Sequence, residues 1–195
     1  MSAIITLAAS AGGLEPLQRI VAAVPIPCRA SIFIVMHVGA HDSVLPLILQ
    51  ASTRLPVSHA THDSPIEPSR IYVAPPDRHM RLRDGRIHLD RGPKVHFARP
   101  AADPLFISAA EAYGTRVVGV VLSGGDGDGA EGLRIIKEHG GLSLVQHPVE
   151  ASSPGMPLAA FGADDPDACL PVAQIAERVA ALCAEDASLV PAPGA

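Results

Sequence analysis

The sequence predicts a doubly wound α/β fold with a mainly parallel sheet and an antiparallel β-hairpin at the edge of that sheet. Short apolar runs alternate along the chain with segments that have helical spacing, which is the pattern of parallel strands joined by crossover helices. Hydrophobic residues make up 48% of the chain, yet aromatic residues are only 3% and Trp is absent. The core must therefore consist of Ala, Val, Leu and Ile, as is common in parallel sheets covered by helices.

Five apolar runs predict buried strands, and five segments between or after them predict helices. In the first of these helical segments the apolar side chains fall on one stripe, formed by Leu14, Leu17, Ile20, Val21 and Val24. The predicted strands are residues 4–8, 31–36, 71–74, 117–122 and 142–146. The predicted helices are residues 14–24, 44–51, 104–113, 130–139 and 171–185.

The segment from residue 78 to residue 93 has a different pattern, because its apolar residues alternate on both sides of an Asp-Gly pair. Met80 and Leu82 precede Asp84-Gly85, and Ile87 and Leu89 follow it. Alternation around Asp-Gly predicts two antiparallel strands joined by a tight turn. We place this hairpin at the edge of the sheet.

Length and composition bound the class of protein. The 195 residues suggest one domain, which we place at residues 1–187, followed by a flexible C-terminal tail at residues 188–195. The net charge of −5 argues against a nucleic-acid partner. Cys28, Cys169 and Cys183 form no CxxC motif, which fits reduced thiols. With no signal peptide and no apolar run of membrane-spanning length, we expect a cytoplasmic protein without membrane insertion.

Polar residues follow three of the predicted strands, where ligand sites of open α/β sheets lie. Ser10 follows the first strand, His37 follows the second, and Asp126 and Asp128 follow "VVGVVLSGG". A serine needs a base to remove its proton, and a histidine needs an acceptor to fix its tautomer, so these side chains could form a catalytic triad.

Each of these residues also has a structural interpretation. Ser10 could cap the helix that begins near Leu14 or belong to a Gly-rich anion loop, and His37 could be a buried histidine with satisfied hydrogen bonds. The "GGDGDG" loop could be a flexible turn or a cation-binding loop, but it lacks the ligand spacing of an EF-hand. We therefore expect no metal there.

Two other features have weaker functional interpretations. The "HATHD" segment, with His59, His62 and Asp63, could hold a metal, but no zinc motif completes it and a solvated loop is the simpler interpretation. Seven of the 15 Lys and Arg residues lie between Arg78 and Arg99. They could meet an acidic partner or form the charged face of an exposed hairpin.

Six stretches together resemble the catalytic domain of the chemotaxis protein-glutamate methylesterases, the CheB family. They follow one another in the family's order from about residue 3 to residue 182. The matching stretches are "AASAGGLEPL", "IVMHVGAH", "RIYVAPPDRHMRLRDGRIHLDRGPK", "RPAADPLFISAAEAYGTRVVGVVLSG", "DGAEGL" and "GGLSLVQHPVEASSPGMPLAA".

The resemblance implies a doubly wound α/β fold and hydrolysis of glutamate methyl esters on chemoreceptor signalling helices, with glutamine deamidation in many members. It implies that Ser10 is the nucleophile, His37 the general base and acid, and Asp128, rather than Asp126, the orienting carboxylate. No metal or organic cofactor is implied. The expected backbone donors to the oxyanion are Gly125, Ala11 and Gly12, and the expected contacts to substrate or partner are Arg99 and Met156.

The sequence departs from the family pattern near these motifs. The third motif is typically G-M-G-x-D-G, whereas "GGDGDG" has Gly125 for the methionine and Asp126 for a glycine. Met36 replaces a common glutamine, and the loop after His37 is not rich in proline and glycine. The family's best-known members carry an N-terminal receiver domain. The match begins at about residue 3, so we expect a stand-alone form, active constitutively or controlled in trans by a separate receiver or methyltransferase protein.

Two other functions are compatible with these residues. One is a non-catalytic module that binds receptors or a methyltransferase, with Gly125 and Asp126 marking a decayed site. Against it, all three triad positions hold suitable residue types. The other is an esterase for small soluble esters, which the family resemblance disfavours.

Overall fold

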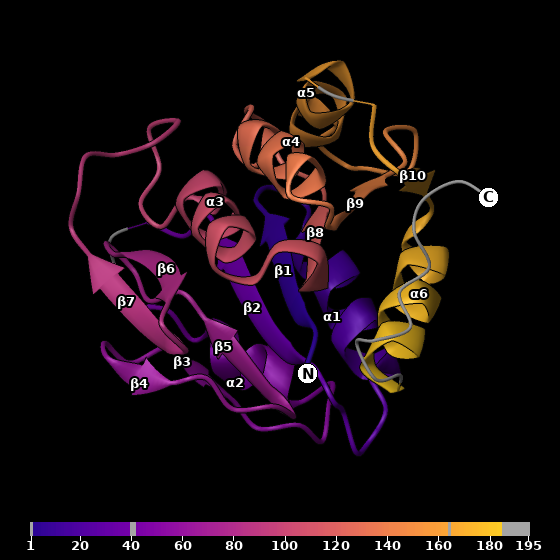
Figure 1. The fold of residues 1–195 in the computed structure, drawn as a ribbon. Coiled ribbons are helices and arrows are strands. Elements are labelled where there is room, and N and C mark those ends of the chain that lie inside the picture. Colours follow the sequence, from indigo (N-terminus) through magenta and orange to yellow (C-terminus); the bar gives the residue numbers. More distant parts are fainter. Residues whose placement is uncertain (1, 40–41, 164, 185–195) are drawn as a thin grey trace.

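The computed structural model describes residues 2–39, 42–163 and 165–184, and its centre is a seven-stranded sheet in the order β10-β9-β8-β1-β2-β5-β3 (Figure 1). Every pairing between these strands is parallel. The strands are β1 (Ile4–Ala9), β2 (Ser31–Met36), β3 (Val57–His59), β5 (Arg70–Val73), β8 (Val117–Val121), β9 (Leu142–Gln146) and β10 (Ala168–Leu170).

Helices cover both faces of this sheet, as a doubly wound fold requires (Figure 1). The side chains of β1 alternate between two apolar clusters, since Ile5 and Leu7 face one and Ile4 and Ala8 the other. The first cluster is closed by α1 (Leu14–Ala23), α2 (Leu45–Gln50) and α6 (Val172–Ala184). The second is closed by α3 (Ala102–Tyr113), α4 (Ala130–Glu138) and α5 (Gly155–Ala163).

The predicted hairpin is confirmed as β6 (His79–Arg83) and β7 (Arg86–Asp90). Its turn residues Asp84 and Gly85 both have positive φ, 52° and 73°, as the tight turn requires. The hairpin does not extend the main sheet but pairs with β4 (Ser64–Pro65) in a separate three-stranded sheet. The outer edge of β6 faces α3, where the Leu82 N–H donates to Ser108 Oγ at 3.0 Å.

All five predicted strands and all five predicted helices are present within a few residues of their expected bounds. The short strands β3, β4 and β10, the 3-10 turn Gly114–Arg116 and helix α5 were not predicted. Helix α5, "GMPLAAFGA", has no polar face, so its sequence shows no helical periodicity. The predicted tail at residues 188–195 lies outside the described residues. Within the described residues, no helix has the length and apolar character needed to cross a membrane.

Candidate active site

The three candidate side chains lie at neighbouring strand ends because of the order of the strands. The chain proceeds from β1 through β2 toward β3 on one side, and later from β8 through β9 to β10 on the other. The order therefore reverses between β1 and β8, which is where ligand sites of open α/β sheets form. In the register of the sheet Ala9 lies opposite Met36, and Ala8 lies opposite Val121. Ser10, His37 and the loop after β8 consequently emerge together.

Ser10 leaves β1 in a tight turn. Its N–H donates to the Ser123 carbonyl at 2.9 Å, and its own carbonyl accepts from the Gly13 N–H at 3.0 Å. Helix α1 begins at Leu14 without a side-chain cap, so the helix-cap interpretation of Ser10 is wrong. Within the described residues Ser10 Oγ makes no hydrogen bond, which leaves the hydroxyl available to a substrate.

Two glycines allow the loops around Ser10 to approach closely. Gly12 has φ +74°, and a Cβ there would lie 2.6 Å from the Ser152 Cβ. A Cβ on Gly124 would lie 1.9 Å from Met156 Sδ and 2.9 Å from the Ser10 Cβ. Met156, which is fully buried, therefore supports the loop after β8 directly beside the serine.

His37 and Asp128 form a close pair. His37 Nε2 lies 2.7 Å from Asp128 Oδ2, and the Asp128 side chain is fully buried. The same carboxylate accepts the Ala102 N–H at 2.5 Å and the Asp103 N–H at 3.0 Å. These are the first N–H groups of helix α3, which stabilise a negative charge at this point. Asp128 thus accepts the Nε2 proton and leaves Nδ1 as the nitrogen that can act as a base.

The pKa of His37 is raised above its ordinary value by the balance of three effects. Burial alone lowers the pKa, because it disfavours the charged imidazolium. The hydrogen bond to Asp128 and the negative charges of Asp128 and Asp126 raise the pKa and outweigh burial. His37 is therefore held in an environment that stabilises the imidazolium.

Asp103, in helix α3, also supports the site, because it binds the start of helix α4. The sequence alone did not indicate this residue. Its Oδ1 accepts the Gly129 N–H at 3.0 Å and the Gly132 N–H at 2.8 Å, at the start of α4. Asp128, beside α4, binds the start of α3, while Asp103, in α3, binds the start of α4. Burial raises the pKa of Asp103, and the nearby charge of Asp128 adds to this effect. The feature of the sequence that could have indicated Asp103 is its position in the first turn of a helix, where an acidic side chain can accept free backbone N–H groups.

His96 completes this network, because its Nε2 lies 3.1 Å from Asp103 Oδ2. Ligand atoms of His96, Asp103 and Asp128 all lie within 4.8 Å of one another. The carboxylate oxygens already accept backbone N–H groups or histidine N–H groups. We therefore interpret the cluster as a hydrogen-bond network and assign no metal to it.

The three backbone groups predicted to bind an oxyanion have free N–H donors. Within the described residues the N–H groups of Ala11, Gly12 and Gly125 donate to no acceptor, whereas those of Ser10 and Gly124 are used within the fold. A Cβ on Gly125 would meet nothing within 4 Å, so the space that the methionine of the family motif would enter is open.

The other predicted residues lie elsewhere and make contacts within the fold. The Arg99 guanidinium binds Asp77, with 2.9 Å from Nε to Oδ1, and the Gly92 carbonyl. His59 Nε2 contacts the Ser43 carbonyl and His62 Nδ1 accepts the Leu89 N–H, so both histidines of "HATHD" bind backbone groups. In the basic stretch five arginines pair with carboxylates of the fold, which favours the structural interpretation; they are Arg81, Arg83, Arg86, Arg91 and Arg99.

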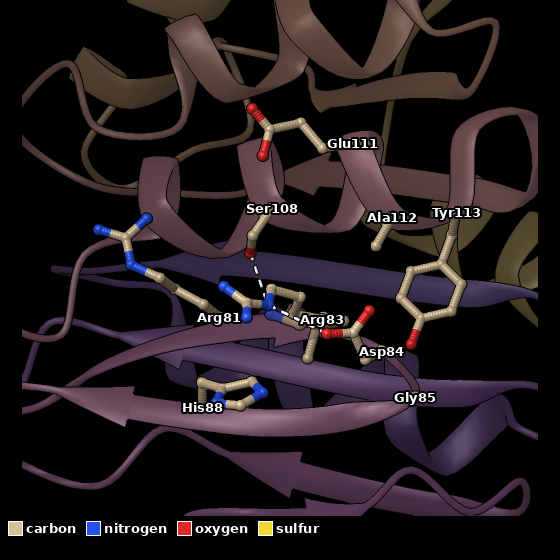
Figure 2. A pocket seen from close by; sticks show the side chains of 10 residues that line it. Arg81, Arg83, Asp84, Gly85, His88, Ser108, Glu111, Ala112 and Tyr113 are labelled. Atoms are coloured by element: carbon tan, nitrogen blue, oxygen red, sulfur yellow. Dashed lines mark hydrogen bonds and ion pairs between the residues drawn. The ribbon is translucent and has the colours of Figure 1, made fainter.

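A cavity of about 650 Å³ among the described residues does not contain the triad. It lies between the C-terminal half of α3 and the hairpin (Figure 2). The side chains around it include Ser108, Glu111, Tyr113, Arg81, Arg83 and His88. Ser108 lies six residues beyond Ala102, about 9 Å along the helix from the N–H groups that bind Asp128.

Comparisons with known proteins find a matching family model and related proteins that are similar along most of this chain. The family model described as CheB methylesterase matches residues 5–179. A Pyrococcus horikoshii protein named protein-glutamate methylesterase/protein-glutamine glutaminase is 37% identical over 90% of this chain and 49% of its own length. A Leptospira interrogans protein, to which the same name is given provisionally, is 37% identical over 89% of this chain and 91% of its own length.

One solved structure is similar over almost its whole length. The crystal structure of the Thermotoga maritima CheB methylesterase catalytic domain has a TM-score of 0.86 and 28% sequence identity. The match covers 93% of this chain and 99% of that domain. The parallel sheet and the small antiparallel sheet are therefore features that the two chains share.

Proposed function

This chain belongs to the CheB methylesterase family, and from that premise we propose that it hydrolyses glutamate γ-methyl esters on chemoreceptors and releases methanol. The observation that carries the proposal is the fully buried Asp128, 2.7 Å from His37 at the strand end beside Ser10. Ser10 is the nucleophile, His37 the general base and acid, and Asp128 the carboxylate that orients His37. The names of the relatives also support glutamine deamidation, in which the same site releases ammonia.

The reaction proceeds as a two-step acyl transfer. His37 Nδ1 takes the Ser10 proton as Oγ attacks the ester carbonyl carbon, and Asp128 stabilises the imidazolium. The N–H groups of Ala11, Gly12 and Gly125 bind the negative oxygen of the tetrahedral intermediate. The imidazolium then gives its proton to methoxide, and methanol leaves an acyl-serine. Water, deprotonated by His37, attacks the acyl carbon. The imidazolium then returns the proton to Ser10 Oγ as the acyl–oxygen bond breaks, which releases the glutamate carboxylate and restores the free serine.

The proposed partners follow from this chemistry. The proposed substrates are methylated chemoreceptor signalling helices, and the proposed location of the enzyme is the cytoplasm. A separate receiver or methyltransferase protein is the proposed regulatory partner. Arg99 and Met156 are proposed contacts to substrate or partner. In the structure the Arg99 side chain donates a hydrogen bond to Asp77, and the Met156 side chain packs against the loop at Gly124.

The test is methanol release from chemoreceptor membranes with labelled methyl groups, comparing wild type with Ser10→Ala. We expect release by wild type and a loss on the order of 10⁴-fold or more in the variant, because the nucleophile is removed. The thermal midpoint should not change, since Ser10 Oγ makes no hydrogen bond within the described residues.

Labelling of Ser10 by a serine-directed phosphonate separates the remaining outcomes. A wild type that is labelled but releases no methanol has an active nucleophile and acts on a different ester. A wild type that neither releases methanol nor reacts with the phosphonate is a binding module, and the proposal would then be wrong.

A further inference from the structure

A second carboxylate faces the catalytic histidine from the side opposite Asp128. Asp126 Oδ2 lies 3.4 Å from His37 Nδ1, whereas Asp128 Oδ2 lies 2.7 Å from Nε2. The imidazole ring therefore has a carboxylate at each of its two nitrogens. The ring itself is largely enclosed, with 12% of its side chain exposed.

The two carboxylates have different environments. Asp128 is fully buried and its oxygens accept N–H groups of α3, while the Asp126 side chain is 38% exposed. Asp126 Oδ1 accepts the Asp128 N–H at 3.0 Å, which fixes the side chain against the loop and directs Oδ2 toward His37. Asp126 is thus held in place beside His37.

This geometry suits only one protonation state of His37. With the Nε2 proton donated to Asp128, a neutral ring presents the Nδ1 lone pair, which repels a carboxylate oxygen. An Nδ1–H group, by contrast, pairs with Asp126. The ring that fits both carboxylates is the imidazolium, and an imidazolium cannot take the proton from Ser10.

Resting on the function proposed above, we propose that Asp126 is a positioning residue that acts through His37: it stabilises the imidazolium in the free enzyme and sets the pH at which His37 becomes a base. The raised pKa of His37 agrees with this role. The charged groups that face His37 within the described residues are Asp128 and Asp126, and beyond them Asp103 and His96. Within the described residues, the charges that shift the pKa of His37 are those of Asp128 and Asp126.

The direct test is the titration of His37 by NMR in wild type and Asp126→Asn. Asparagine keeps an oxygen for the Asp128 N–H, so the loop is preserved while the charge is removed. We expect the His37 midpoint to fall by about half a pH unit, the size expected for a partly exposed ion pair. Glu111→Gln, which removes an exposed acid at the other end of α3, is the matched control and should not move the midpoint.

The pH profile of kcat/KM gives a second measurement. The acidic limb of Asp126→Asn should move to lower pH by the same amount, so that one unit below the wild-type midpoint the variant is about threefold faster. A His37 midpoint that is unchanged in Asp126→Asn would overturn the proposal, even if the activity changed.

The NMR titration also separates this proposal from the proposed function. If wild type has no esterase activity but the His37 midpoint falls in Asp126→Asn, the role of Asp126 stands and the assigned reaction is wrong. If the enzyme is active and the midpoint stays constant, the reaction stands and the role of Asp126 is wrong.

Discussion

The two ends of helix α3 differ in the side chains and backbone groups that surround them. At the N-terminal end, the buried carboxylate of Asp128 accepts two backbone N–H groups and holds His37. At the C-terminal end lies the cavity of about 650 Å³, bounded by arginines that pair with neighbouring acids such as Asp90 and Asp84. Backbone N–H groups directed at the strand crossover therefore hold the Asp128–His37 pair at one end of α3, whereas the cavity at the other end is lined by none of the three candidate side chains.

The largest effect in this comparison should come from Asp128→Asn. The asparagine NH₂ group must stand either at the Oδ1 position, where it faces the Asp103 N–H, or at the Oδ2 position, where it faces the Ala102 N–H and His37 Nε2. At least one hydrogen bond is therefore lost in either orientation, and the negative charge that stabilises the imidazolium is lost in both. We expect kcat/KM to fall on the order of 10²- to 10⁴-fold, measured as methanol release. The free energy of unfolding should fall by about 1–3 kcal/mol in urea titrations.

Asp126→Asn is the matched variant for this measurement, because it alters the other acid of the same loop. If Asp126→Asn were inactive and Asp128→Asn retained wild-type activity, the orienting carboxylate would be Asp126. The interpretation of the N-terminal end of α3 as the catalytic end would then have to be abandoned.

The convergence of these strand ends could be predicted from the sequence, because each polar residue follows an apolar run of a predicted parallel sheet. Ser10, His37 and Asp128 each follow an apolar strand, and the order of parallel strands brings such ends together. The choice of Asp128 over Asp126 came from the family motif, since both acids are flanked by glycine. Their different burial and partners arise from tertiary packing against α3, which no local pattern contains.

Asp103 and the position of the hairpin illustrate what local patterns could not supply. Asp103 satisfies N–H groups 26 and 29 residues away, at Gly129 and Gly132. The alternation of Met80 and Leu82 predicted the hairpin, and its turn is confirmed, but a strand's apolar pattern does not specify its partner. The partner β4 has only two residues, too few to show any periodicity.

A smaller effect is expected at Asp103, which joins α3 to α4. Asp103→Ala removes the acceptor of two N–H groups and should lower the free energy of unfolding by about 1–3 kcal/mol. Asp103→Asn keeps one oxygen for both groups and should cost less than about 1 kcal/mol. Urea unfolding at neutral pH measures both. Equal losses in the two variants would show that the charge, and not the acceptor, links the helices.

The free energy of unfolding of wild type, compared with that of Asp103→Asn, should depend on pH in one direction. Burial, together with the charge of Asp128, raises the pKa of Asp103 in the folded state above its unfolded value. The folded state then binds the proton more tightly, so the free energy of unfolding falls as pH rises from the unfolded pKa of about 4 through the folded pKa. Asparagine does not titrate. The stability of wild type relative to Asp103→Asn should therefore decrease as pH rises through that interval.

The smallest effects should come from the C-terminal end of α3. Glu111 and Arg83 both border the cavity of about 650 Å³, and Arg83 is 78% exposed and pairs with its neighbour Asp84. Because neither side chain contacts the triad, Glu111→Gln and Arg83→Gln should each change kcat/KM by less than about twofold, and exposed substitutions of this kind usually alter stability by no more than about 0.5 kcal/mol. Methanol release and urea unfolding, run beside Asp128→Asn, measure both quantities. A tenfold loss in either variant with unchanged stability would show that the protein substrate extends from the triad to the hairpin, and the two ends of α3 would then belong to one functional surface.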